Sequence, residues 1–244
     1  MTDNAQQVVV IGAGPGGYAA AFMAADLGLD VTLIDPDVNP GGVCLYRGCI
    51  PSKAFLHAAR LIHETRAAET FGISFDGLKV DRKKLKKWKE DVVGQVTSGL
   101  GMLVKRKKIQ YIRGWASFLD HHHLKVQESD GQERRINFEH AVIATGSRPF
   151  IPTSLDIDSD HLWDSTAALE LQTVPKRLLV IGGGYIGLEL GTVYAALGSD
   201  VEVVEMTAGL PPGRRSRFGS LFEQERGNKI CGHSLEDHGD CSFI

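Results

Sequence analysis

Near its amino end the chain runs VVVIGAGPGGYAAAFMAADLGLDVTLID from Val8 to Asp35. An apolar run leads into a glycine turn, and an alanine-rich stretch that ends at Gly28 leads into a second apolar run and an acid. This order predicts a strand, a turn, a helix and a second strand, which together make one βαβ unit. The turn matches G-x-G-x-x-G at Gly12, Gly14 and Gly17. These glycines permit the tight turn, the close approach of a pyrophosphate and the packing of helix on strand.

The first turn predicts a dinucleotide site. The helix that follows it offers backbone N–H groups and a partial positive charge to phosphates. Asp35 lies 18 residues beyond Gly17, where an acid can accept hydrogen bonds from ribose hydroxyls. A glycine turn without a ligand is the alternative, but the strand, helix and acid in register argue against it.

The same sequence pattern recurs late in the chain, at Gly182, Gly184 and Gly187, with Glu205 again 18 residues beyond the last glycine. An acid at this position favours a free 2′-hydroxyl and therefore NAD. A 2′-phosphate would favour an arginine nearby, and Met206 follows instead. The second turn therefore predicts an NAD site in preference to an NADP site.

Other patterns predict an α/β chain. The expected elements are a loop over 39–53, helices over 52–70, 82–108 and 188–197, an antiparallel meander over 111–118, 124–128 and 134–138, and a buried strand over 140–144. The basic run from Arg82 to Lys89 is expected to form a solvated helix face, with Trp88 on the buried side.

Two cysteines, Cys44 and Cys49, lie five residues apart in CLYRGCIPSK. A zinc site usually needs a closer pair and a second pair of ligands, which the nearest histidines do not supply. Cys49 is expected just before a helix capped by Ser52. Because a helix N-terminus and Lys53 both favour a thiolate, the pair predicts a redox-active disulfide. Two buried structural thiols are the alternative.

The segment GGVCLYRGCIPSK, both glycine motifs and ATGSRP at 144–149 together resemble the FAD-dependent pyridine nucleotide-disulfide oxidoreductases, from about Val8 to Glu205. The resemblance implies a Rossmann-type FAD/NAD(P)-binding fold with a three-layer FAD domain and an incomplete NAD domain. Within the family, the segment is most similar to enzymes that oxidise dihydrolipoamide with NAD⁺. Glutathione reductases typically have lysine in place of Ser52, whereas mercuric reductases share Pro-Ser-Lys and remain an alternative.

The resemblance implies roles for individual residues. Cys44 matches the thiol that exchanges with substrate, and Cys49 matches the thiol in charge-transfer contact with the flavin. Lys53 lies near the flavin N5, with Glu189 as its ion-pair partner. Electrons pass from dihydrolipoamide to the cysteine pair, then to FAD and then to NAD⁺. The residues expected to contact FAD are Gly12, Gly14, Gly17, Asp35, Lys53, Gly114 or Ala116, Thr145, Gly146 and Ser147. Those expected to contact NAD are Gly182, Gly184, Gly187 and Glu205.

The resemblance also implies domains and partners. Residues 1–148 are expected to form the FAD-binding domain, 149–206 the start of the NAD-binding domain, and 207–244 an aberrant, poorly ordered tail. Family members are about twice as long and form homodimers, and those that oxidise dihydrolipoamide take it from a 2-oxo acid dehydrogenase complex. Their second half carries a histidine base that this sequence lacks. PPGRRSRFG at 211–219 suggests a frameshift near codon 213, and a genuine variant tail is the alternative. An inactive nucleotide-binding fragment is the alternative function.

Composition excludes several classes of protein. The 27 basic and 30 acidic residues give a net charge of −3, which offers no electrostatic case for nucleic acid. No apolar run approaches the roughly 20 residues that span a bilayer. The polar N-terminus carries no secretion signal, and 4 cysteines are too few for a disulfide scaffold, so the cytoplasm is expected. No metal site is expected, since 121–123 (three histidines) suit a solvated turn.

Overall fold

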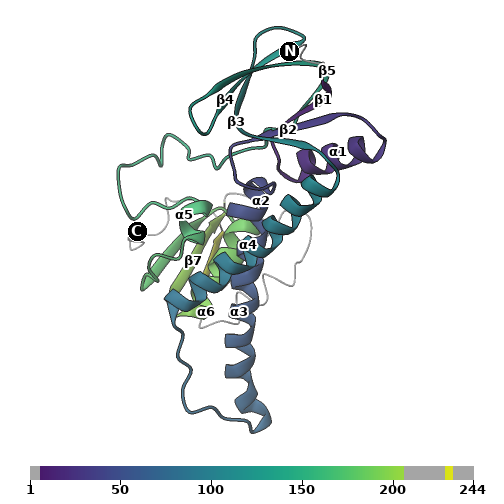
Figure 1. Cartoon of the computed structure of the whole chain (residues 1–244). Helices are drawn as coiled ribbons and strands as arrows, with labels where there is room; N and C mark the ends of the chain where they lie inside the picture. Colours follow the sequence, from purple (N-terminus) through teal and green to yellow (C-terminus); the bar gives the residue numbers. More distant parts are fainter. Residues whose placement is uncertain (1–5, 206–228, 233–244) are drawn as a thin grey trace. The chain divides into compact units, whose positions relative to one another are not determined.

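The computed structural model describes residues 6–205 and 229–232 (Figure 1). The chain divides into a first unit, Met1–Ile50 with Asp91–Arg148, and a second unit, Pro51–Glu90 with Pro149–Ile244. Segment 51–90, which the sequence predicts within the FAD-binding domain, belongs to the second unit. The assignment of FAD and NAD to these domains stays a prediction. The predictions on the tail lie outside the described residues, apart from 229–232.

The first unit is built on a closed barrel of strands in the order β1-β2-β3-β4-β5. β1 pairs in parallel with β2 and β5, β2 pairs in parallel with β3, and the pairs β3–β4 and β4–β5 are antiparallel. Their bounds are β1 Gln6–Ile11, β2 Val31–Asp35, β3 Gln110–Phe118, β4 His123–Glu128 and β5 Glu133–Ile143. The α1 helix, Pro15–Asp26, lies beside β1 and β2 (Figure 1).

β1 is buried on both faces. Val9 and Ile11 join the side chains inside the barrel, and Val8 and Val10 pack with buried residues of α1 and with Val104. Val104 belongs to α4, Arg82–Arg106. A strand covered on both faces has no polar face, which explains the unbroken apolar run that begins at Val8.

β5 corrects the prediction of two strands at 134–138 and 140–144. It is one strand of 11 residues, whose first part pairs with β4 and whose last part, from Phe138, pairs with β1. Ile136 and Phe138 are 7% and 5% exposed, whereas Val142 and Ile143 near the end of the strand are 37% and 67% exposed. The part predicted as a buried strand over 140–144 is therefore largely exposed, and that prediction is wrong.

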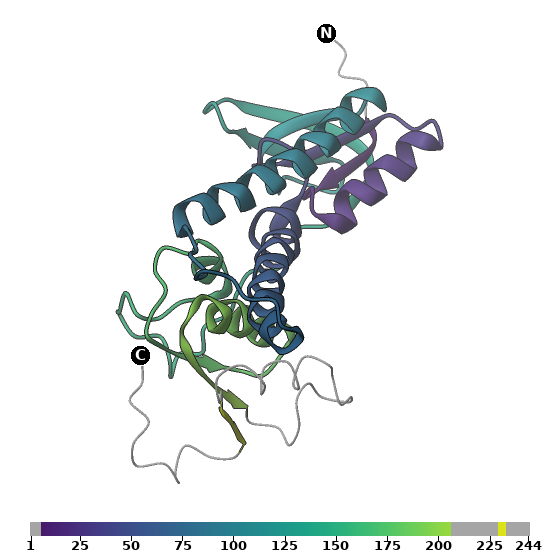
Figure 2. The same cartoon turned by 90° about the horizontal axis from the view of Figure 1, so that it is seen from below.

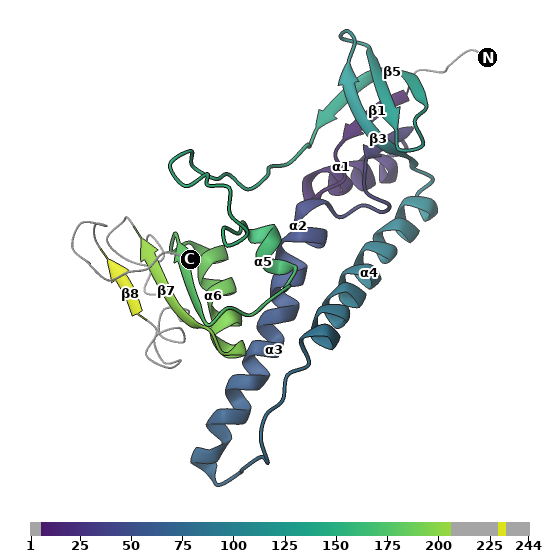
Figure 3. The same ribbon diagram turned by 90° about the vertical axis from the view of Figure 1, so that its left-hand side faces the viewer.

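The second unit contains a parallel sheet in the order β6-β7-β8. Its strands are β6 Arg177–Ile181, β7 Asp200–Glu205 and β8 Lys229–Gly232, and Figure 2 shows β8 beside β7. The helices are α3 Cys49–Ala67, continued by the 3₁₀ turn Ala68–Phe71, α5 Ser165–Leu169 and α6 Tyr185–Leu197. Side chains of α3, α5, α6 and β7 share one apolar core, and Figure 3 shows α6 between the sheet and α3. The sequence pattern predicted no strand after Glu205, and β8 shows that this prediction is wrong.

The segment that carries the cysteines is more helical than predicted. α2, Gly42–Arg47, lies within the expected loop, and α3 begins at Cys49. Ser52 is therefore not the N-cap, and Cys49 is the first residue of the helix. Pro51 is compatible with this start because the N–H that proline lacks has no partner in the first turn of a helix.

The prediction of a solvated face for the basic run on α4, with Trp88 on the buried side, is also wrong. Trp88 is 40% exposed, whereas Lys89 is only 5% exposed, with its ammonium 5.8 Å from the ring centroid of Phe55. Arg82 donates to the Leu171 carbonyl and Lys86 to the Glu170 carboxylate, both at 2.8 Å. One face of the run thus faces protein and not solvent.

No helix in the described part of the chain is long and apolar enough to cross a membrane.

Candidate nucleotide and disulfide site

The first glycine turn follows β1 directly. Gly12 has φ +96°, and its N–H donates to the Ile34 carbonyl at 2.8 Å. A Cβ on Gly17 would stand 1.7 Å from the Gly12 carbonyl oxygen. The first glycine therefore makes the turn and the third lets α1 pack on it, as these positions require.

Asp35 closes this turn from the end of β2. Its Oδ2 accepts the Ala13 N–H at 2.7 Å, and its Oδ1 accepts the Asp37 N–H at 2.9 Å. Desolvation by burial raises the pKa of Asp35 above its ordinary value, although both backbone hydrogen bonds act in the opposite direction. The acid predicted for ribose recognition thus also fixes the shape of the turn.

Two further segments meet the same turn. Gly41 donates its N–H to the Ala13 carbonyl at 2.8 Å, and a Cβ on Gly42 would lie 2.5 Å from the Gly14 Cα. On the other side, a Cβ on Gly12 would lie 2.3 Å from the Ala144 carbonyl oxygen and 3.0 Å from the Thr145 Cα. The structure therefore brings together the first glycine motif, the segment that leads to Cys44 and the segment of Thr145, Gly146 and Ser147.

This turn fits the pyrophosphate of a dinucleotide. No side-chain hydrogen bond caps α1, which has Pro15 in its first turn. A Cβ on Gly16 would meet no described atom within 4 Å, and one on Gly14 would meet only Gly42, at 3.9 Å. The backbone N–H groups at the start of the helix are therefore accessible for phosphate oxygens.

Gly114 and Ala116 lie on β3, where it pairs with β4. Gly114 is buried, and a Cβ there would stand 2.4 Å from the Gln127 carbonyl oxygen. Ala116 is half-buried against the apolar side chains inside the barrel. Close packing of strands accounts for the glycine, and contact of either residue with an adenine stays a prediction.

The cysteines lie on consecutive helices. Cys44 is on α2 and half-buried, and Cys49 opens α3 and is exposed. Gly48 separates the helices, and a Cβ there would lie 2.9 Å from the Val43 carbonyl oxygen and 3.3 Å from the Cys44 Cα. Only a residue without a side chain lets the chain turn back this closely onto Cys44.

Glu189, on α6, holds two residues of the first turns of α3. Lys53 forms an ion pair with Glu189 Oε1, and the Ser52 hydroxyl donates to Oε2 at 2.9 Å. Glu189 and Lys53 were predicted as partners, but the contact of Ser52 was not predicted. Cys49 and Lys53 lie one turn apart on α3, so they occupy the same face of that helix.

The second glycine turn repeats the first. Gly182 has φ +104° and donates its N–H to the Val204 carbonyl at 2.8 Å, and a Cβ on Gly187 would lie 2.3 Å from the Gly182 carbonyl oxygen. Glu205 Oε2 accepts the Gly183 N–H at 2.8 Å, as Asp35 accepts that of Ala13. A Cβ on Gly184, the N-cap of α6, would meet no described atom within 4 Å. This turn therefore fits a second dinucleotide by the same criteria.

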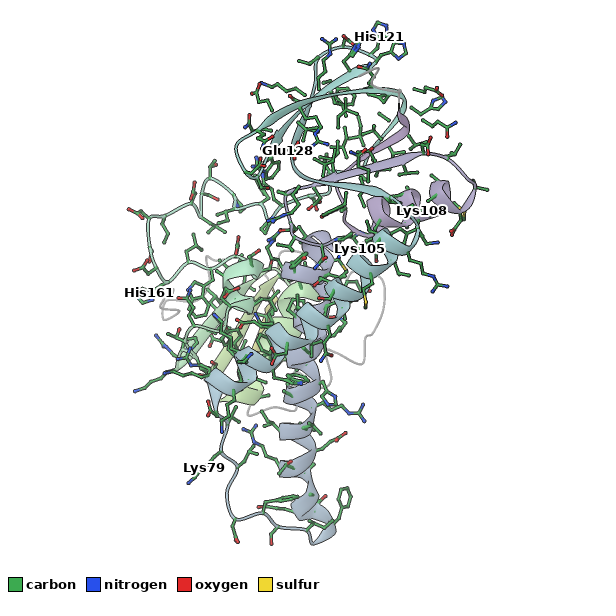
Figure 4. All side chains as sticks on the ribbon, viewed as in Figure 1. Lys79, Lys105, Lys108, His121, Glu128 and His161 are labelled. Carbon is green, nitrogen blue, oxygen red and sulfur yellow. The ribbon has the colours of Figure 1, made fainter. Side chains whose placement is uncertain are left out.

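Within residues 6–205 and 229–232, no group of three or more His, Cys, Asp and Glu side chains is arranged to hold a metal ion. His121 lies at the tip between β3 and β4 (Figure 4). The ring of His123 contacts the Asp120 carboxylate at 2.8 Å, and the His122 ring lies 3.4 Å from the Phe138 carbonyl oxygen.

Comparisons with known proteins agree with this geometry. The chain is 48% identical to the dihydrolipoyl dehydrogenase of Haemophilus influenzae over 200 residues, which are 82% of this chain and 42% of that protein. It is 47% identical to the dihydrolipoyl dehydrogenase of Haloferax volcanii over 213 residues, 86% of this chain and 44% of the relative. The chain thus spans less than half the length of these curated relatives.

Among solved structures, the fold matches a Cu(II) complex of the HOCl-induced flavoprotein disulfide reductase RclA from Escherichia coli, with a TM-score of 0.77 and 28% identity. The match covers 95% of this chain and 50% of that one. The family model described as pyridine nucleotide-disulphide oxidoreductase matches residues 6–228. The chain therefore belongs to the pyridine nucleotide-disulphide oxidoreductase family.

Proposed function

We propose that this chain carries the FAD site, the redox-active disulfide and an NAD site of a flavoprotein that oxidises dihydrolipoamide with NAD⁺. Its substrate would be the dihydrolipoyl group of a 2-oxo acid dehydrogenase complex, and its assembly a homodimer. The similarity to dihydrolipoyl dehydrogenases supports the choice of substrate.

One observation carries the proposal. The backbone of Ala13, inside the first glycine turn, donates to Asp35 and accepts from Gly41, the residue that precedes the cysteine-bearing helix. A dinucleotide on this turn would therefore lie next to the segment that bears the disulfide. FAD, when bound, supplies two-electron transfer between a dithiol and a nicotinamide.

The cysteine pair would perform thiol–disulfide exchange. A thiolate of dihydrolipoamide attacks the Sγ of Cys44 in the Cys44–Cys49 disulfide, and Cys49 leaves as a thiolate. The second substrate thiol then attacks the mixed disulfide and releases Cys44, so the substrate leaves as lipoamide. Two electrons now reside in the reduced pair. Cys49, the leaving group of the first exchange, is the first residue of α3.

Lys53 and Glu189 would set the charge near the flavin. The Glu189 carboxylate, whose side chain is 13% exposed, fixes the ammonium of Lys53. Ser52 holds the other oxygen of that carboxylate, so the direction of the ion pair is defined from both sides.

The test is the visible absorption spectrum of the purified chain with FAD, taken without oxygen before and after addition of dihydrolipoamide. We expect flavin absorption and, after reduction, a long-wavelength band that Cys49→Ser abolishes and Cys44→Ser retains. Ser98→Ala, on the exposed side of α4, serves as the matched control. Failure to retain FAD would contradict the proposed flavin site and favour an inactive fragment. If Hg²⁺ reoxidises the NADH-reduced chain while dihydrolipoamide does not reduce the oxidised chain, the proposed substrate is wrong.

A further inference from the structure

We propose that Tyr46 and Arg47, the two residues at the end of α2, are positioning residues that hold Cys44 in place for closure of its disulfide with Cys49. The inference rests on the proposed redox function of that pair.

α2 needs external support because it has only 6 residues. A helix shorter than about 12 residues is marginal in water even with favourable residues. Glycines also flank it: Gly42 begins the helix at φ +57°, and Gly48 follows its last residue. With the disulfide open, a helix of this kind would unwind unless other contacts held it.

Tyr46 supplies one such contact. Its hydroxyl donates to the Asn39 carbonyl at 3.0 Å and accepts the Asn39 N–H at 3.3 Å. Its ring packs on Gly41, since a Cβ there would lie 3.0 Å from Tyr46 Cε2. The end of the helix is thereby fastened to the segment that precedes its start.

Arg47 supplies the second contact. Its guanidinium forms an ion pair with Asp37 Oδ2 at 3.1 Å and lies 5.9 Å from the centroid of the Tyr46 ring. Arg47 is three residues beyond Cys44, so the two side chains are neighbours on the helix surface.

The segment that receives these contacts is itself fixed. Asp37 donates its N–H to Asp35 and accepts the Tyr111 hydroxyl at its carbonyl, at 2.9 Å each. Asn39 packs tightly on α4, since a Cβ on Gly101 would lie 2.1 Å from its Oδ1. Contacts to a fixed segment restrict Cys44, whereas contacts to a mobile one would move with it.

The consequence is thermodynamic. Held in this way, Cys44 stays beside the turn at Gly48 when the disulfide is open, which raises the effective concentration of one thiol toward the other. By linkage, closure of the disulfide strengthens the contacts of Tyr46 and Arg47 by the same factor. Loss of either contact should therefore favour the dithiol.

The test is the equilibrium constant for the Cys44–Cys49 disulfide of the full chain in glutathione buffers, read from the linked peptide by mass spectrometry. We expect Tyr46→Phe, which removes both hydrogen bonds of that hydroxyl, and Asp37→Asn, which removes one ion pair, each to lower the constant about three- to fivefold. Arg47→Gln should lower the constant, whereas Arg47→Lys, which keeps the charge, should leave it close to the wild-type value. Arg60→Gln removes an exposed ion pair with Glu64 on α3 and is the matched control, expected to change nothing.

The outcomes separate the two proposals. If the wild-type chain forms no Cys44–Cys49 disulfide at any glutathione ratio, the proposed function fails. If the disulfide forms and Tyr46→Phe and Asp37→Asn match the wild-type constant, the positioning role is wrong. Circular dichroism and Tm confirm that each variant keeps its fold. Should Tyr46→Phe lose it, Asp37→Asn, which alters an exposed pair, decides the question.

Discussion

Because Gly17 has no side chain, α1 can pack closely on the first glycine turn, which is the candidate dinucleotide site. A Cβ at Gly17 would stand 1.7 Å from the Gly12 carbonyl oxygen, so alanine there must displace the turn. We expect Gly17→Ala to lower the free energy of unfolding by about 3 kcal/mol, in the range of overpacked buried sites. Gly16→Ala, one residue away and with no described atom within 4 Å of its Cβ, should instead stabilise α1 by about 0.5 kcal/mol. Urea unfolding of both variants measures the contrast, and equal effects would contradict the steric argument.

Tyr194 is a buried phenol on α6 with one hydrogen bond, from its hydroxyl to the Ala168 carbonyl at 2.8 Å. We expect Tyr194→Phe to lower the free energy of unfolding by about 1 kcal/mol, because it removes this buried hydrogen bond and leaves the carbonyl with the Leu171 N–H at 3.2 Å. Burial raises the pKa of Tyr194 from 10.0 to about 12. The native state therefore keeps a proton that the unfolded state loses, so the contribution of Tyr194 to stability falls as pH rises above 10.0.

Unfolding of wild type and Tyr194→Phe between neutral and alkaline pH measures both effects. The difference in stability between the two proteins should shrink above the ordinary tyrosine pKa. Tyr185→Phe, at a tyrosine that is 64% exposed, is the control and should leave stability unchanged. A constant difference across the range would contradict the burial of an intact phenol.

Contacts between helices of the second unit depend on charge. Lys86 on α4 donates to Glu170, which follows α5, at 2.8 Å. This hydrogen bond, aided by the charge of Lys89, lowers the pKa of Glu170 below its ordinary value of 4.5. The native state therefore binds this proton less readily than the unfolded state. The stabilisation is present above pH 4.5 and is lost as pH falls through the lowered pKa.

We therefore expect Glu170→Gln to lower stability at neutral pH and to approach wild-type stability in acid. Equilibrium urea unfolding over that pH range is the measurement. Glu64→Gln, which removes an exposed pair within α3, is the control. If Glu170→Gln remains less stable than wild type in acid, packing and not charge accounts for the contribution of Glu170 to the contact between α4 and α5.

For the molecule as a whole, the two glycine turns lie in different compact units. Each turn is closed by its own acid: Asp35 accepts the Ala13 N–H, and Glu205 accepts the Gly183 N–H. We expect FAD to raise the Tm of Gly187→Ala but not that of Gly17→Ala, and NAD⁺ to do the reverse. A ligand at 100 times its Kd stabilises the state that binds it by about 2.7 kcal/mol, so the shifts are measurable by thermal denaturation. Loss of both shifts in either variant would contradict independent sites.

Local patterns in the sequence were enough for much of this architecture. Both βαβ units, the glycine turns and their acids were predictable because apolar runs, glycines and caps act within a few residues of one another. The pair of Lys53 and Glu189 was expected only through resemblance to a family. β5 was wrongly predicted as two strands because its pairing with distant strands has no strong local signal. The start of α3 was predicted wrongly because the sequence does not show that Pro51 is tolerated in its first turn.

Tertiary contacts supplied the rest. The hydrogen bond of Ser52 to Glu189 joins residues 137 positions apart, and Gly41 and Gly42 acquire their role only by packing on the first glycine turn. Lys89 is buried and Trp88 exposed, against the preference of either side chain, because the fold of α4 against its neighbours sets which face is covered. Periodicity specifies which elements form and roughly where. Which side chains meet, and which acid closes which turn, depends on free energies of burial and pairing that arise only once distant segments lie together.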